Sequence, residues 1–129
     1  MRMNDQDYFR SCIARERQLA HLLGHQHIEE CYESAGTLWD DAQALPKWTR
    51  DWGACGPLMA AHGISVEFGS DPAHSDKAFV RAGSTRVYVE DHPTRDRAVM
   101  YAVVKELIVL LEHANLHKAA RPAAALQAL

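Results

Sequence analysis

The sequence predicts one α+β domain spanning residues 1–129, in which helices pack on a small antiparallel sheet of about three strands. Apolar residues recur at three- and four-residue spacing near both ends of the chain, which is the period of an amphipathic helix. Apolar and polar residues instead alternate in several runs between positions 64 and 90, which is typical of half-buried strands. Neither an internal repeat nor a linker interrupts the chain. We expect the long C-terminal helix to cover the sheet.

Two helices are expected at the N-terminal end. The first spans residues 5–23, and its apolar face consists of Phe9, Cys12, Ile13, Leu19, Ala20 and Leu23. Gly24 follows as a stop signal. The second is expected over residues 27–35, because Ile28, Cys31, Tyr32 and Ala35 again repeat at helical spacing and Gly36 follows them.

The segment 36–56 is expected to be an irregular loop that wraps onto the core. It contains Trp39, Trp48 and Trp52, and each side chain of this kind can bury on the order of 200 Å². A short helix is then expected over residues 57–62, because proline is favoured in the first helical turn and Gly63 ends the run.

The next segment predicts strands. A strand over residues 64–68 would direct Ile64, Val66 and Phe68 to the core, and residues 69–76 are expected to form a turn-rich loop. Alternation resumes on either side of Gly83-Ser84, so residues 78–90 predict a β-hairpin with a tight turn.

The last helix is expected over residues 95–115, with Thr94 as its N-cap. Its apolar stripe contains Met100, Val103, Val104, Leu107, Ile108 and Leu111. Residues 118–129, mostly alanine and leucine, are expected to form a flexible tail or a weak extra helix.

The composition is that of a globular protein, with 47% apolar and 24% charged residues and a net charge of −3. Such a charge gives no general attraction to nucleic acid. Cys12, Cys31 and Cys55 are too widely spaced for a zinc ribbon or a redox pair. No signal-peptide pattern and no apolar run of membrane-spanning length is present. We therefore expect a cytoplasmic protein that binds neither nucleic acid nor membrane.

The centre of the chain contains four motif parts in order: a Thr-x-Asp-Trp element, a glycine-containing spacer, a Gly-Pro-Leu-Met sequence and a later isoleucine. The residues of this pattern are Thr49, Asp51, Trp52, Gly56, Pro57, Leu58, Met59 and Ile64. The pattern resembles the signature of the NinX-like family of small bacteriophage and prophage proteins, and the resemblance covers about residues 46–111. The N-terminal helices depart from the family's usual start. The resemblance implies a phage or prophage accessory protein in a family without a characterised reaction.

Four residues of the expected hairpin form a candidate binding surface. Phe79, Arg81, Arg86 and Tyr88 share the sheet face opposite Val87. Arginine and tyrosine are enriched at the centres of protein interfaces. We expect this face to bind a host protein or a second copy of the chain. The alternative is that the N-terminal helices cover it and the arginines extend to solvent.

A second candidate site lies at the start of the expected short helix. There Trp48 and Trp52 would stack a nucleotide base, while Asp51, Gly56 and free backbone N–H groups would form an anion-binding helix start. The competing interpretation is structural: Asp51 caps a turn and Trp52 fills the core. We favour the structural interpretation, which predicts that Trp52→Ala costs about 3–5 kcal/mol.

Two histidine pairs have the i, i+4 spacing that can bind zinc from one helix face: His21 with His25, and His113 with His117. The glutamate of the zinc-protease motif is absent, and Gly24 interrupts the helix before His25. We therefore expect solvent-facing or helix-ending histidines, and no metal or cofactor.

The function expected from these observations is non-enzymatic, because the sequence contains no P-loop, no nucleophile elbow and no catalytic cysteine motif. We expect an accessory protein of a phage or prophage that binds and modulates a host macromolecule, as in counter-defence. The alternative is a protein that binds or sequesters a small nucleotide signal.

Overall fold

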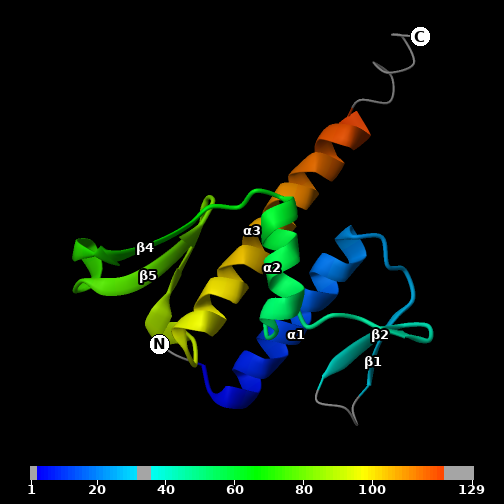
Figure 1. Ribbon diagram of the computed structural model, residues 1–129, viewed down its shortest axis with the longest axis horizontal. Helices are drawn as coiled ribbons and strands as arrows, with labels where there is room; N and C mark the ends of the chain where they lie inside the picture. The colour runs from blue at the N-terminus through cyan, green and yellow to red at the C-terminus, as the bar shows by residue number, and fades with distance from the viewer. Residues whose placement is uncertain (1–2, 32–35, 121–129) are drawn as a thin grey trace.

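The computed structural model describes residues 3–31 and 36–120, with side chains as far as residue 117. Within these ranges, three α-helices accompany two separate three-stranded antiparallel sheets (Figure 1). The elements in chain order are α1 (Asp5–Leu22), β1 (Ile28–Cys31), β2 (Thr37–Asp40), β3 (Gln43–Ala44), α2 (Trp52–Ala61), β4 (Val66–Asp71), η1 (Pro72–His74), β5 (Lys77–Ala82), β6 (Thr85–Tyr88), η2 (Val89–Asp91) and α3 (Arg95–Ala120). The expected α+β class is confirmed.

Helix α1 agrees closely with the expected range. The side chain of Asn4 caps it by accepting a hydrogen bond from the backbone N–H of Asp7 at 2.8 Å. Its buried face includes Cys12, Ile13 and Leu19, and α1 packs lengthwise on α3. The two helices form the centre of the core (Figure 1).

The first sheet corrects the helix that the sequence predicts over residues 27–35. Where the structure describes this segment, it forms strand β1, which pairs with β2 from Ile28 opposite Asp40 to Cys31 opposite Thr37. Strand β3 extends the sheet beyond β2, so the segment 36–56 is only partly irregular. Cross-strand pairing prevails over the helical preference of this short run, because isolated helices of such length are marginal in water.

The chain after β3 packs inward, as expected of a tryptophan-rich segment. Leu45 and Trp48 are buried. Next to them, the Glu16 carboxylate of α1 is almost completely buried and accepts hydrogen bonds from Thr49 and from the guanidinium of Arg50. These contacts fix the segment between the first sheet and α2 to the middle of α1.

Helix α2 begins five residues earlier than the sequence predicts. Asp51 is its N-cap, and the carboxylate of Asp51 accepts a hydrogen bond from the N–H of Gly53 at 2.9 Å. Pro57 therefore lies inside the helix and not at its start. Trp52, in the first turn, is 41% exposed, so the expectation that it fills the core is wrong.

The second sheet has the strand order β4-β5-β6, and Gly83-Ser84 forms the expected tight turn between β5 and β6. Strand β4 continues to Asp71, three residues into the expected loop, because residues 69–71 pair with β5. Phe68 is 58% exposed, contrary to its expected place in the core. It lies on the edge strand β4, whereas α3 packs mainly on β5 and β6.

Helix α3 covers the inner face of this sheet, as predicted. The Thr94 hydroxyl accepts a hydrogen bond from the N–H of Arg97 at 3.1 Å, which confirms the expected N-cap. Val103, Val104 and Leu107 are fully buried on the side that faces the sheet and α1. The helix runs to Ala120, past its expected end, and residues 121–129 of the expected tail lie outside the described range. No helix in the described chain is long and apolar enough to cross a membrane.

Candidate functional site

The four residues predicted to form a binding surface lie together on the second sheet. Phe79 is opposite Tyr88, and Arg81 is opposite Arg86, so all four side chains project from one face. Val80, between Phe79 and Arg81, projects from the other face and is completely buried. We call the face that carries these four side chains the outer face of the sheet. The face that carries Val80 is the inner face.

The outer face is open. In the part of the chain that the structure describes, α3 is the only helix that packs extensively on this sheet, and it lies on the inner face (Figure 1). Helix α1 packs on α3 and β1 instead. The interpretation in which the N-terminal helices cover the outer face is therefore wrong.

Phe79 is held in place from several directions. Its ring lies across Gly69 of β4, where an added Cβ would come within 2.5 Å of the ring, so this close approach requires glycine. The guanidinium carbons of Arg81 and Arg86 lie 5.4 and 4.9 Å from the ring centroid. Such cation–π contacts favour one arrangement of the three side chains. Phe79 is thus a half-buried ring between two cations and not a solitary exposed one.

Asp71 fixes the other end of the outer face. Its buried carboxylate accepts a hydrogen bond from the Tyr88 hydroxyl at 2.7 Å and lies 2.8 Å from His74 Nδ1. Arg86 approaches the same carboxylate at 3.8 Å. The hydrogen bond from Tyr88, followed by that from His74, lowers the pKa of Asp71. The same bond raises the pKa of Tyr88, because its hydroxyl donates to a carboxylate.

The remaining charges of the outer face are paired. Arg81 lies 3.6 Å from Glu67, and Lys77 lies 3.0 Å from Glu90. The hydrogen bond and charge of Glu90 raise the pKa of Lys77. The face is therefore of mixed charge, which is typical of protein interfaces and unlike the continuous basic patch that nucleic acid requires.

A pocket of about 260 Å³ opens beside β6, next to the outer face. Its walls include the rings of Tyr8, His92 and Tyr101, together with Arg86 and Lys105. Tyr8 comes from α1, His92 precedes α3, and the others come from β6 and α3. The sequence does not indicate this pocket, because its residues come from distant segments that carry no shared motif.

The floor of the pocket is a polar network. The Tyr8 hydroxyl lies 2.5 Å from His92 Nδ1, and the hydroxyls of Ser11 and Tyr101 are hydrogen-bonded. Burial is the main cause that raises the pKa of Tyr8, so its hydroxyl stays protonated at neutral pH. The network offers hydroxyl and imidazole groups to a polar ligand.

The residues of the expected nucleotide site are not brought together. Trp48 is buried with 5% exposure, whereas Trp52 faces solvent. The carboxylate of Asp51 occupies the start of α2, and Gly56 lies inside the helix. An anion is therefore not favoured at this helix start, and the expected geometry at Pro57 is wrong.

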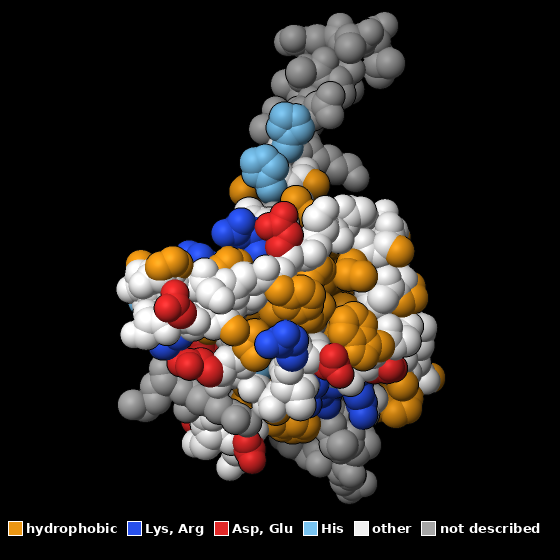
Figure 2. Space-filling view, turned by 60° about the vertical axis from the view of Figure 1, so that its left-hand side comes forward, with side chains coloured by type: hydrophobic (Ala, Val, Ile, Leu, Met, Phe, Trp, Pro, Cys, Tyr) orange, Lys and Arg blue, Asp and Glu red, His pale blue; other side chains and the backbone are white. Residues whose placement is uncertain are grey.

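The first of the two histidine pairs, His21 and His25, is also separated, whereas the second stays together on one helix. His25 follows the end of α1 and its Nδ1 lies 2.7 Å from Asp40 Oδ2, while His21 is exposed on the last turn of α1. His113 and His117 are exposed on α3, where Figure 2 shows histidine side chains on the projecting part of the molecule.

Comparison with models of protein families, with curated protein sequences and with solved structures gives no significant match. The resemblance to the NinX-like family therefore stays a prediction. In the structure the motif has supporting roles: Thr49 and Arg50 bind Glu16, and Asp51 caps α2. Through these contacts the motif positions α2.

Proposed function

We propose that this chain is a non-enzymatic binding protein that docks a partner protein on the outer face of the β4–β5–β6 sheet. The observation that carries the proposal is an open face on which Phe79, Tyr88 and two arginines are already held in place. Fixed aromatic and arginine side chains lose little conformational entropy on binding. Such a face suits a partner of mixed charge with an apolar centre.

The resemblance of residues 46–111 to the NinX-like family supports a biological setting for this activity. In that setting the chain is a bacteriophage or prophage accessory protein that acts in the cytoplasm of the host. Its partner is a host protein, and the binding serves counter-defence.

Affinity capture from bacterial lysate tests this proposal. The wild-type chain is expected to retain one protein in stoichiometric amount, and the double variant Phe79→Ser/Tyr88→Ala is expected to lose it. Val109→Ser, which changes an exposed residue of α3, is the matched control and should retain the same protein. Circular dichroism of the double variant checks that the fold survives.

Two outcomes would contradict the proposal. The first is equal capture by the wild type and the double variant, since the partner would then bind elsewhere. The second is that no protein is retained while sedimentation shows that the wild type is a dimer and the double variant a monomer. The outer face would then join two copies of the chain.

The pocket beside β6 supports a second candidate function, the binding of a small anionic ligand such as a nucleotide. Its aromatic walls, with Arg86 and Lys105 among the lining residues, suit a base and a phosphate. Excess absorbance at 260 nm in the purified protein, lost in Lys105→Ala, is the expected result. A purified protein without nucleotide, whose melting temperature does not change with added nucleotides, would contradict it.

A further inference from the structure

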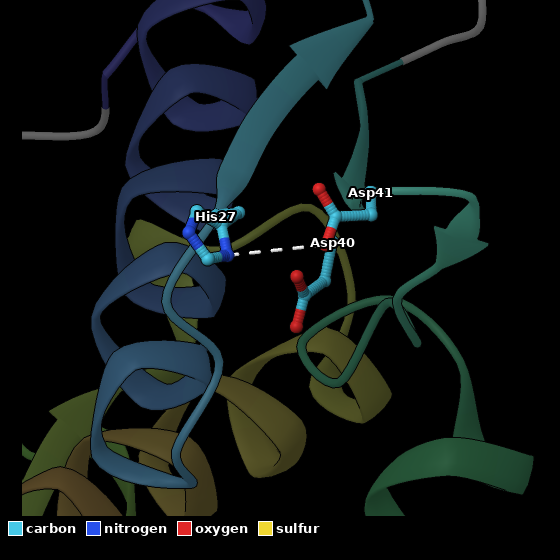
Figure 3. Close-up of side chains that lie close together, drawn as sticks. All are labelled: His27, Asp40 and Asp41. Carbon is cyan, nitrogen blue, oxygen red and sulfur yellow. Dashed lines mark ion pairs between the residues drawn. The ribbon is translucent and has the colours of Figure 1, made fainter.

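Two imidazoles and two carboxylates meet at the open end of the β1–β2 hairpin. His27 immediately precedes β1, Asp40 ends β2, and Asp41 follows it. Ligand atoms of these three side chains all lie within 4.8 Å of one another. Figure 3 shows the three side chains directed toward a common space between the two chain segments, with the ion pair between His27 and Asp41 dashed.

The backbone brings these groups together. Antiparallel pairing places Ile28 opposite Asp40, so the residues just outside this pair, His27 and Asp41, also lie across from each other. Asp41 has a positive φ of 53°, which turns the chain toward β3. The position of the cluster thus follows from strand pairing and not from chance contacts of long side chains.

His25 adds a fourth group of the same kind. Its Nδ1 lies 2.7 Å from Asp40 Oδ2, and both side chains are mostly buried. A ligating carboxylate is commonly held by such a hydrogen-bonded neighbour, which fixes its orientation. His27 and Asp41 are in contrast 70% and 79% exposed, so the cluster is accessible to an ion from solvent.

We propose that His27, Asp40 and Asp41 bind one divalent transition-metal ion, with His25 orienting Asp40. Imidazole nitrogen and carboxylate oxygen are ligands of Zn²⁺, at about 2.0–2.2 Å from the ion. In the tetrahedral geometry typical of Zn²⁺, two ligand atoms of one ion are then about 3.3–3.6 Å apart. The spacing here needs only small rotations of exposed side chains. Three protein ligands leave a coordination position for water.

The bound ion cross-links two neighbouring segments of the first sheet. It joins the segment that enters β1 to the segment that leaves β2, beside the paired residues Ile28 and Asp40. A ligand that binds only the folded chain stabilises it by an amount that grows with the logarithm of the ligand concentration above Kd. Zn²⁺ therefore raises the melting temperature of the protein.

The test uses Zn²⁺ as the probe and the full chain as the protein. The parent variant is His113→Ala/His117→Ala, which removes the exposed pair on α3 that has zinc-binding spacing. Isothermal titration of this parent is expected to show one Zn²⁺ per chain. Adding His27→Ala or Asp41→Ala is expected to weaken the affinity by at least about tenfold. Both positions are exposed, so without metal the variants are expected to have the same melting temperature as the parent.

The same parent variant also shows how far the ion stabilises the fold. Zn²⁺ is expected to raise the melting temperature of this variant, and a chelator is expected to reverse the rise. Loss of all Zn²⁺ binding in the parent would overturn the proposal, since the α3 pair would then be the site. Unchanged affinity in both His27→Ala and Asp41→Ala would also overturn it.

Discussion

Arg50 and Glu16 form a buried ion pair, with 2.6 Å between a guanidinium nitrogen and a carboxylate oxygen. Glu16 is 1% exposed and also accepts hydrogen bonds from the hydroxyl and the backbone N–H of Thr49. Every oxygen of the carboxylate is therefore satisfied, which is the condition for tolerating a buried charge. The pair joins the centre of α1 to the segment that leads into α2.

Removing one partner of this pair is expected to be strongly destabilising. Glu16→Ala removes the charge partner of Arg50 and the acceptor of the Thr49 hydroxyl, and breaking a buried ion pair in this way typically costs about 3–5 kcal/mol. Urea denaturation measures the free energy of unfolding. Glu67→Ala, which removes an exposed partner of Arg81, is the control and should cost less than about 1 kcal/mol. Similar losses for the two variants would show that Glu16 is not a structural anchor.

Trp48 and Trp52, which flank Arg50 in the sequence, are expected to differ in their contribution to stability. Trp48→Ala empties a buried site and should cost about 3–5 kcal/mol. Trp52→Ala changes a side chain that is 41% exposed, so we expect a loss of roughly 1 kcal/mol. Denaturation of the two variants in parallel makes the comparison, and a larger loss for Trp52→Ala would show that α2 packs more deeply.

The buried thiol of Cys55 is expected to be unreactive in the folded protein. Burial raises the pKa of Cys55 to about 11, and only the thiolate attacks alkylating reagents. At pH 8, alkylation of Cys55 should be slower in the native than in the unfolded chain by about two orders of magnitude or more. Peptide mass spectrometry follows the modification of this residue. Equal rates in native and unfolded protein would contradict the burial of α2 against the core.

Asp71 is expected to make part of the stability depend on pH. Its pKa in the folded state is lowered below the unfolded value of about 3.9, chiefly by the hydrogen bond from Tyr88. The stability that the charged Asp71 carboxylate contributes is therefore fully present above about pH 4. This stability is lost as the pH falls through the lowered pKa of the folded state. Asp71→Asn should lose less stability than the wild type when the pH falls from about 5 to about 2.

Acid denaturation of the Asp71 variant needs a control, because all carboxylates titrate in this range. Glu29→Gln changes an exposed carboxylate of β1 and should follow the wild-type profile. If Asp71→Asn and the wild type lose stability in parallel, the hydrogen bonds to Asp71 do not favour its charged form.

Local signals in the sequence predict the elements whose ends are determined by adjacent residues. Thr94 caps α3 as expected, and Gly83-Ser84 closes the hairpin, because capping and tight turns depend on a few neighbouring side chains. The first sheet could not be found in this way. Strand β1 contains Glu29 and Glu30, which favour helices, and it becomes a strand only through pairing with β2.

The candidate surface was predictable in part. Alternation places Phe79 and Arg81 on one face of a strand, and the hairpin turn fixes Tyr88 and Arg86 opposite them. The contacts of Gly69 and Asp71 with these residues could not be predicted, because both lie in a segment that was expected to be a loop. Exposure of Trp52 was missed for a similar reason, since the start of α2 depends on the cap at Asp51.

Site-specific photo-cross-linking tests the central claim most directly. A photoreactive phenylalanine analogue in place of Arg81 lies on the outer face, and the same analogue in place of Val109 lies on the exposed side of α3. The account predicts that irradiation in bacterial lysate joins one protein to position 81 and not to position 109. Labelling of the same protein from both positions, or from position 109 alone, would contradict a docking surface on the β4–β5–β6 sheet.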